Sequence, residues 1–201
     1  SGELIYFLDS DDDILPDCIE DLVTAYIDTG ADIVIAENYF IESSKKNTVQ
    51  ISLPEGYYKG GKVVESFCRR LWNNQVWNKL IKKELITRNN IFFAEGLTLE
   101  DELFSLQIAL NANALYVLKK PTYNYYIRQG SIIRTAGRNL GRWLTFSSIN
   151  RLMSDYIVNH GFNRNPFVAR YFLENVIVNL SQIHRLKKLE YPIFRDITSL
   201  Y

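Results

Sequence analysis

The run Glu3-Leu4-Ile5-Tyr6-Phe7-Leu8 is apolar after its first residue and ends abruptly in the acidic segment Asp9-Ser10-Asp11-Asp12-Asp13. The run is too short for a stable helix and rich in strand formers, so it predicts a buried parallel strand. Apolar residues then recur at helical spacing between Pro16 and Gly30, and residues 31–36 return to a strand pattern. Strand, helix and strand indicate an α/β fold that presents carboxylates at a strand's carboxyl end, where open α/β sheets bind ligands.

Working outward from this segment, the remaining pattern is mostly helical. Residues 43–61 are polar and predict a loop or an edge hairpin. Two paired strands, 115–118 and 123–128, are expected around a turn at Lys119-Lys120-Pro121. Helices are expected over 63–72, within 77–89, from Thr98 to about 110, over about 139–160 and over about 165–187. We divide the chain into a catalytic part, 1–135, and a helical C-terminal region, 136–201.

The composition is that of a folded soluble protein, with 47% hydrophobic and 23% charged residues in 201. No apolar segment is long enough to span a bilayer and no signal peptide opens the sequence, so we expect a cytoplasmic protein. Its two cysteines suit reduced thiols. The net charge of zero divides into −6 over residues 1–130 and +6 over residues 131–201. The basic part is expected either to be solvated or to rest weakly on the anionic inner face of the membrane. No nucleic-acid partner is expected.

The acidic segment is the first candidate site. Carboxylates this close repel one another unless a cation or hydrogen bonds offset their charge. Mn²⁺ or Mg²⁺ is therefore expected, since such ions bind one or two carboxylates together with substrate phosphates. A solvated turn that caps the following helix at Asp17 is the structural alternative. A calcium loop starting at Asp9 is disfavoured, because Ile14 stands where that loop needs glycine and Pro16 interrupts it. A phosphatase with Asp-x-Asp after a strand would have a small residue and Thr or Val where Asp12-Asp13 stand.

Several motifs in order resemble family 2 glycosyltransferases, including bacterial enzymes that build surface polysaccharides. The first is the DxD segment, residues 6–12, with Ile14-Leu15-Pro16-Asp17 after it. The others are residues 77–81, 93–97, 100–104 and 125–132, so that the resemblance covers roughly residues 3–135. It implies a GT-A fold. The family's N-terminal nucleotide-binding half has no counterpart here, which predicts the C-terminal portion of such a domain that is inactive alone.

The resemblance also implies roles for particular residues. Asp9 and Asp11 would form the DxD pair, with Asp11 the more direct metal ligand and Asp9 nearer the ribose, and Asp12 would support them. Asp101, in the pair Glu100-Asp101, matches the catalytic base. The substrate-binding residues would be completed by Arg128, by Ser131 and by Trp77, although on sequence alone Trp77 is better explained by core packing.

A base must be ionised, and the first turn of the helix predicted from Thr98 favours a negative charge at Asp101. Thr98-Leu99-Glu100-Asp101 also has the form of a capping box, which would give Asp101 a purely structural role.

The expected reaction is an inverting transfer of a hexose or hexosamine from a nucleotide-sugar, with a UDP-sugar the leading candidate. The acceptor would be a saccharide or a lipid-linked saccharide, and a homo-oligomer remains open. Two other functions also remain open. One is a non-catalytic polysaccharide-binding or assembly domain, and the other is a metal-dependent phosphoryl-transfer enzyme that uses the same acidic cluster.

Overall fold

A computed structural model of the chain describes residues 2–43, 45–97, 99–128 and 140–185. Its centre is a mixed sheet in which one pair of long strands, β3 and β7, runs parallel and the other pairs run antiparallel. The main path follows the order β1 (Leu4–Tyr6), β6 (Lys79–Lys82), β3 (Ile33–Glu42), β7 (Ala114–Tyr126) and β2 (Asp13–Ile14). Off this path, β4 (Lys45–Val49) pairs with β3, and β5 (Gly56–Lys59) pairs with β7. The α/β class is confirmed.

The first strand differs from the prediction of a buried parallel strand. β1 is half-buried, stands at one end of the strand order and pairs antiparallel with β6. Just after β1, the isolated bridge from Phe7 to Trp77 is parallel. The reason is β6 itself, a strand that residues 79–82 form where the pattern predicted only a helix. The predicted helix is the second half of that segment, α3 (Lys83–Arg88), which ends at Asn89 as expected.

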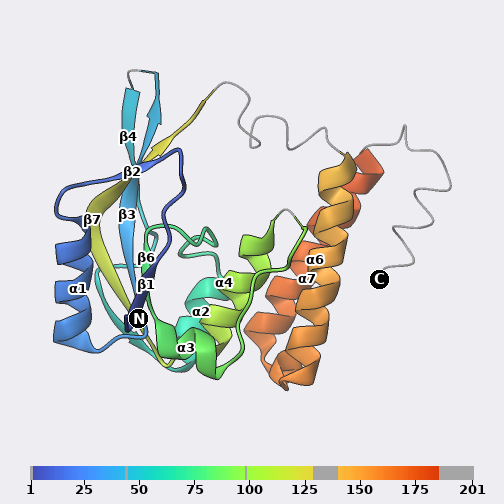
Figure 1. Cartoon of the computed structure of the whole chain (residues 1–201). Helices are drawn as coiled ribbons and strands as arrows, with labels where there is room; N and C mark the ends of the chain where they lie inside the picture. Colours follow the sequence, from blue (N-terminus) through green and yellow to red (C-terminus); the bar gives the residue numbers. More distant parts are fainter. Residues whose placement is uncertain (1, 44, 98, 129–139, 186–201) are drawn as a thin grey trace.

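Helix α1 (Cys18–Thr29) covers one face of the sheet, as Figure 1 shows at the left. Cys18 and Leu22 pack against Val34 and Leu80 there. Gly30 ends the helix at a φ of 65°, which glycine adopts without strain, and its N–H bonds the Tyr26 carbonyl. Asp17 stands at the N-cap position, but its side chain makes no capping hydrogen bond. The structure therefore lacks the capping contact that the structural alternative required of Asp17.

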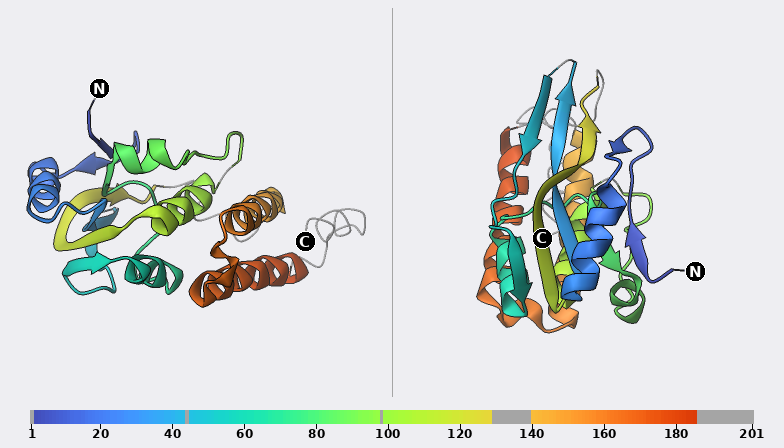
Figure 2. Two further views of the ribbon diagram at one scale, coloured as in Figure 1. Left: turned by 90° about the horizontal axis from the view of Figure 1, so that it is seen from below. Right: turned by 90° about the vertical axis from the view of Figure 1, so that its left-hand side faces the viewer.

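The other face of the sheet carries the larger core. It is covered by α2 (Gly61–Cys68) and α4 (Glu100–Asn111), and the pair α6 (Leu140–Asn159) and α7 (Pro166–Arg185) packs outside them (Figures 1 and 2). A short turn of 3-10 helix, Phe162–Arg164, joins that pair. The two C-terminal helices are confirmed close to their expected bounds. No helix in the described part of the chain is both long and apolar enough to cross a bilayer.

Strand β7 is the clearest departure from the predicted elements. The two short strands and their turn are wrong, because residues 114–126 form one continuous strand. Between Ala36–Asn38 of β3 and Leu118–Tyr123 of β7 the register shifts, so Lys119 and Lys120 are accommodated as a bulge. Pro121 lacks an N–H to donate and falls in this irregularity, where a missing ladder bond costs least. Residues 43–61 contain β4, which forms a hairpin with β3, and a hairpin was one of the two expectations for that segment.

Helix α7 is only partly buried. Val168, Tyr171 and Ile183 are buried, whereas Leu180 is exposed and Asn179 is buried. On α6, Phe146, Ile149 and Met153 are all buried. The seam between the helices thus combines apolar contacts with buried amides.

Candidate active site

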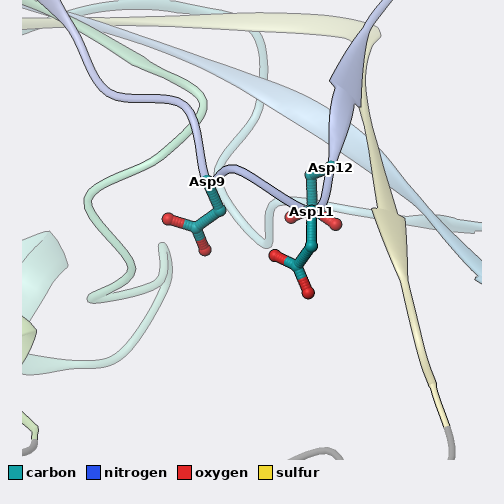
Figure 3. Close-up of side chains that lie close together, drawn as sticks. All are labelled: Asp9, Asp11 and Asp12. Carbon is teal, nitrogen blue, oxygen red and sulfur yellow. The ribbon is translucent and has the colours of Figure 1, made fainter.

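The acidic loop follows β1 and leads into β2. One carboxylate oxygen from each of Asp9, Asp11 and Asp12 lies within 4.8 Å of the others. Asp9 and Asp11 are exposed, and Figure 3 shows their carboxylates pointing to the same side of the loop. Asp12 is half-buried behind them. Oxygen-only ligands at this spacing are those that Mg²⁺ and Mn²⁺ prefer.

The loop is shaped by strand β7, far away in sequence. The hydroxyl of Tyr123 donates to Asp12 Oδ2 at 2.8 Å and accepts the backbone N–H of Asp9 at 3.3 Å. The N–H of Tyr126 donates to Asp12 Oδ1 at 3.0 Å. Both oxygens of Asp12 are therefore engaged in holding the turn. No described residue donates a hydrogen bond to the carboxylates of Asp9 or Asp11, so these two are the groups able to hold a cation.

The electrostatics agree with this division. Burial, and then the charges of Asp12, Asp11 and Glu100, raise the pKa of Asp9. Burial also raises the pKa of Asp12, against the opposing effect of its hydrogen bonds from Tyr126 and Tyr123. Crowded carboxylates with raised pKa values are relieved by a divalent cation, which replaces mutual repulsion with attraction.

Arg128 lies beside the same loop. Its Nη2 donates to the backbone carbonyl of Asp11 at 2.6 Å, so the guanidinium is held next to the acidic cluster from the end of β7. Ser131, the other expected contact in this segment, lies outside the described residues.

The second acidic group lies on the first turn of α4. Glu100 and Asp101 are both half-buried there. The N-cap position is occupied by Leu99, at a φ of 71° and with no side-chain cap, and Thr98 lies outside the described residues. Among the residues described, no side chain therefore caps this helix.

Asp101 has an unusual ionisation behaviour. Burial raises its pKa to about 6, and the negative charges of Glu100 and Asp9 add to the rise, while Lys79 and a backbone hydrogen bond at Val76 oppose it. The expectation that the helix dipole keeps this carboxylate readily ionised is overridden by burial. A carboxylate with a pKa near 6 is still mostly ionised at pH 7, and it is a stronger base than an ordinary aspartate.

Sequence reasoning missed two residues that organise the site. Lys79 is 3% exposed, and its Nζ donates to Asn73 Oδ1 at 2.9 Å and to the Gln75 carbonyl. Burial lowers its pKa to about 7, against the opposing attraction of Asp101. Tyr123 is the other, through its contacts with the acidic loop. Both lie in or next to the motif blocks 77–81 and 125–132, which was the one available signal.

Trp77 is buried and packs behind the site. Its ring stacks on Tyr123 with centroids 4.6 Å apart and on Tyr125 at 5.3 Å. Through Tyr123 the indole is linked to the acidic loop, whereas its own ring is covered by protein.

Comparison with known proteins identifies the class. The model of the family "Glycosyl transferase family 2" matches residues 1–93. The resemblance carried by the sequence motifs is thus confirmed, and the chain carries a glycosyltransferase family 2 segment.

Individual relatives agree with this class. The chain is 24% identical over 163 residues to the uncharacterized glycosyltransferase YibD of Escherichia coli, covering 76% of this chain and 47% of that protein. It is 29% identical over 143 residues to glycosyltransferase GlyG of Streptococcus pneumoniae, covering 67% and 47%. The chain thus spans about half the length of these relatives.

The fold is similar to that of Staphylococcus aureus TarS, residues 1–349. The TM-score is 0.62 at 22% identity, and the match covers 87% of this chain and 47% of that one. The predicted GT-A-type fold, with helices at its C-terminal end, is therefore confirmed.

Proposed function

We propose that the whole protein transfers a hexosyl or hexosaminyl group, with inversion, from a nucleotide-sugar to a saccharide or lipid-linked acceptor during polysaccharide synthesis. The observation that carries the proposal is the coupling of two acidic groups from distant elements. The loop that bears Asp9 and Asp11 and the first turn of α4 lie close enough for Glu100 to raise the pKa of Asp9, and for Asp9 to raise that of Asp101.

A UDP-sugar is the proposed donor. One relative is a poly(ribitol-phosphate) β-N-acetylglucosaminyltransferase, TarP of S. aureus, and TarS has been solved in complex with UDP-GlcNAc. The match to this TarS complex has a TM-score of 0.58, and the shared fold supports a donor of the same chemical class.

The proposed mechanism divides the work between the two groups. Asp11 and Asp9 would hold Mn²⁺ or Mg²⁺, which when bound offsets the charge of the leaving diphosphate. Asp12 keeps the loop in shape and Arg128 adds positive charge beside it. Asp101 accepts the proton of the attacking acceptor hydroxyl, which its raised pKa favours. Glu100 tunes Asp101, and Ser131 is proposed as a further contact of the substrates. The buried ring of Trp77 acts indirectly, by supporting Tyr123 behind the acidic loop.

The test is a nucleotide-sugar panel with the full-length protein and Mn²⁺, comparing the native protein with Asp11→Asn. We expect turnover of at least one donor, with release of free sugar or transfer to an added acceptor, and loss of most of it in the variant. Release of inorganic phosphate instead would identify a phosphoryl-transfer enzyme. Binding of polysaccharide without any turnover would identify a non-catalytic assembly domain.

We propose further that residues 1–201 alone do not turn over a nucleotide-sugar. The acidic loop supplies metal and diphosphate contacts, which by themselves hold a donor weakly. Micromolar binding of a UDP-sugar by this chain in calorimetry would contradict the idea.

A weak contact of the helical region with the inner membrane surface is proposed on two observations. Residues 131–201 carry a net charge of +6, and α7 exposes Leu173, Ile177 and Val178. Flotation of the full-length protein with anionic vesicles at low but not at high salt would support it. A protein that floats at neither salt, but sediments as a dimer, would instead assign α7 to self-association.

A further inference from the structure

A cavity of about 260 Å³ lies between the β3–β4 hairpin, the segment after α2 and helix α7. Its apolar lining combines three aromatic side chains with Val49, Ile51 and Leu71. The ring of Phe67 lies 4.9 Å from that of Trp72 and 5.3 Å from that of Tyr171, centroid to centroid.

The polar part of the lining consists mainly of amides. Asn38, Gln50, Asn73 and Asn74 line the cavity together with Ser52. Asn38 is only 2% exposed, and its Nδ2 has no hydrogen-bond partner among the described residues. A buried amide nitrogen without a partner costs free energy, and a ligand towards which the Asn38 amide turns to donate a hydrogen bond would recover it.

The size and chemistry of the cavity select one class of ligand. The volume is just below the roughly 300 Å³ at which pockets for drug-sized molecules begin, so it suits a single small ring. A pyranose has an apolar C–H face that packs on aromatic rings and hydroxyl groups that pair with amides. The single charged group in the described lining, Arg70, is already engaged with Asn175 and lies over the Tyr171 ring, which favours a neutral sugar.

The segment that lines the cavity at residues 73–74 also contacts the helix of the candidate base, Asp101. Asn73 accepts the buried Nζ of Lys79, and the Asn74 carbonyl accepts Ser105 Oγ of α4. Two residues further on, the backbone at Val76 hydrogen-bonds Asp101. A sugar ring bound against residues 73–74 would therefore contact the same short segment, residues 73–76, that hydrogen-bonds Asp101.

We propose that this cavity binds one neutral pyranose residue of the acceptor and so selects the acceptor next to the base. The proposal rests on the function proposed above and adds the acceptor's chemical class and its place in the fold.

The test measures binding of methyl glycosides of glucose, galactose, N-acetylglucosamine and N-acetylgalactosamine to the full-length protein by saturation-transfer NMR, with Mn²⁺ and UDP present. Asn38→Leu keeps a similar volume but removes the amide, and Ser52→Phe narrows the cavity without touching Asn38. Asn163→Leu, the same chemical change at an exposed position outside the cavity, is the matched control. Amide spectra of all the variants report whether they fold.

We expect at least one glycoside to bind. Its affinity should fall about five- to tenfold in Asn38→Leu, the loss expected for one hydrogen bond, and further in Ser52→Phe, and stay unchanged in the control. Absence of binding by all four glycosides, or equal affinities in the two cavity variants and the control, would overturn the proposal. If Asn38→Leu weakens glycoside binding but the protein turns over no nucleotide-sugar, the cavity is a sugar site and the proposed transferase function is wrong. If the protein turns over a nucleotide-sugar and neither cavity variant changes the KM for the acceptor, the transferase function is kept and the cavity is rejected as the acceptor site.

Discussion

At the scale of single residues, the site divides its carboxylates by what surrounds each of them. Asp12 receives two hydrogen bonds from β7, Asp9 and Asp11 receive none from the described residues, and Asp101 is held in a partly buried position with two negative neighbours. Groups of one chemical type are thereby suited to the separate tasks proposed for them, which are shaping the loop, binding a cation and accepting a proton.

Tyr123→Phe tests how the loop is shaped. The substitution keeps the buried ring and removes only the hydroxyl that joins Asp12 Oδ2 to the N–H of Asp9. We expect a loss of about 1–2 kcal/mol in the free energy of unfolding, measured by urea denaturation, together with weaker Mn²⁺ binding in calorimetry. Tyr126→Phe is the control, because the Tyr126 hydroxyl donates to Asp13, which is not one of the three clustered carboxylates. Equal Mn²⁺ affinities in the two variants would show that Tyr123 does not organise the cation site.

Asp101→Asn separates a base from a structural residue by pH. The pKa of Asp101 is raised from 3.8 to about 6 in the folded protein, so ionisation of this group destabilises the fold. This cost is complete above about pH 6 and absent below about pH 4. We therefore expect the variant to be more stable than the native chain at pH 7.5, with the difference vanishing towards pH 4 in thermal unfolding.

In the full-length protein the same substitution should lower transfer at least about 100-fold and leave donor binding intact. The native rate should fall as the pH drops through about 6, because the base becomes protonated. A variant that is less stable at pH 7.5 yet fully active per folded molecule would assign Asp101 to helix capping.

At the scale of elements, the bulge in β7 places two adjacent lysines in different environments. Lys119 extends its Nζ to the buried Glu37, 2.7 Å away, and its backbone N–H donates to Glu55. Lys120 pairs with Asp21 at 2.6 Å on the exposed side. The bulge is thus fastened by one ion pair inside and one outside.

Replacing each lysine by alanine compares the two pairs. Lys119→Ala leaves the buried carboxylate of Glu37 with the N–H of Ile51, at 3.3 Å, as its remaining donor among the described residues. We expect a loss of about 2–3 kcal/mol in unfolding free energy. Lys120→Ala should cost less than about 1 kcal/mol, because exposed ion pairs contribute little. Similar losses for both variants, measured by chemical denaturation, would mean that the Glu37–Lys119 pair does not fasten the bulge.

Elements with a strong local pattern were predictable from sequence. The helix from Cys18 to Thr29 shows its apolar spacing and its terminal glycine, and the long C-terminal helices show theirs. The strand of residues 79–82 was not predictable, because two of its four residues are lysines and its pairing with β1 and β3 is non-local. Lys119-Lys120-Pro121 has the composition of a turn, and only the neighbouring strand decides that it becomes a bulge.

The candidate site follows the same division. The acidic loop and the pair Glu100-Asp101 could be predicted, because closely spaced carboxylates and family motifs are visible in the sequence. The contribution of Tyr123 could not, since its hydroxyl reaches Asp12 across 111 positions of sequence. The raised pKa of Asp101 was also out of reach, because burial depends on the completed fold.

At the scale of the whole molecule, the larger core joins the two regions into which the sequence was divided. Phe67 and Leu106 belong to the same buried cluster as Ile149, Met153 and Tyr171 of the C-terminal helices. Tyr171 also donates a hydrogen bond to Glu102 on the helix of the candidate base. The helical region therefore supports the site from behind.

Truncation tests this dependence. A chain of residues 1–135 should fail to unfold cooperatively and give a poorly dispersed amide spectrum, because removal of α6 and α7 exposes buried residues of α2 and α4. A chain ending at residue 185 keeps the described core and should unfold in one transition. A well-dispersed spectrum for residues 1–135 would show that the first region is an independent domain.

The stack of Trp77 on Tyr123 also gives the molecule an optical reporter. Indole fluorescence shifts with the local electric field, and here the indole contacts the tyrosine whose hydroxyl bridges Asp9 and Asp12. Only two other tryptophans are present, Trp72 and Trp143, so a variant with phenylalanine at both positions would have a single emitter. The arrival of a cation at the acidic loop can then be followed in real time, without a label, as a change in the emission of Trp77.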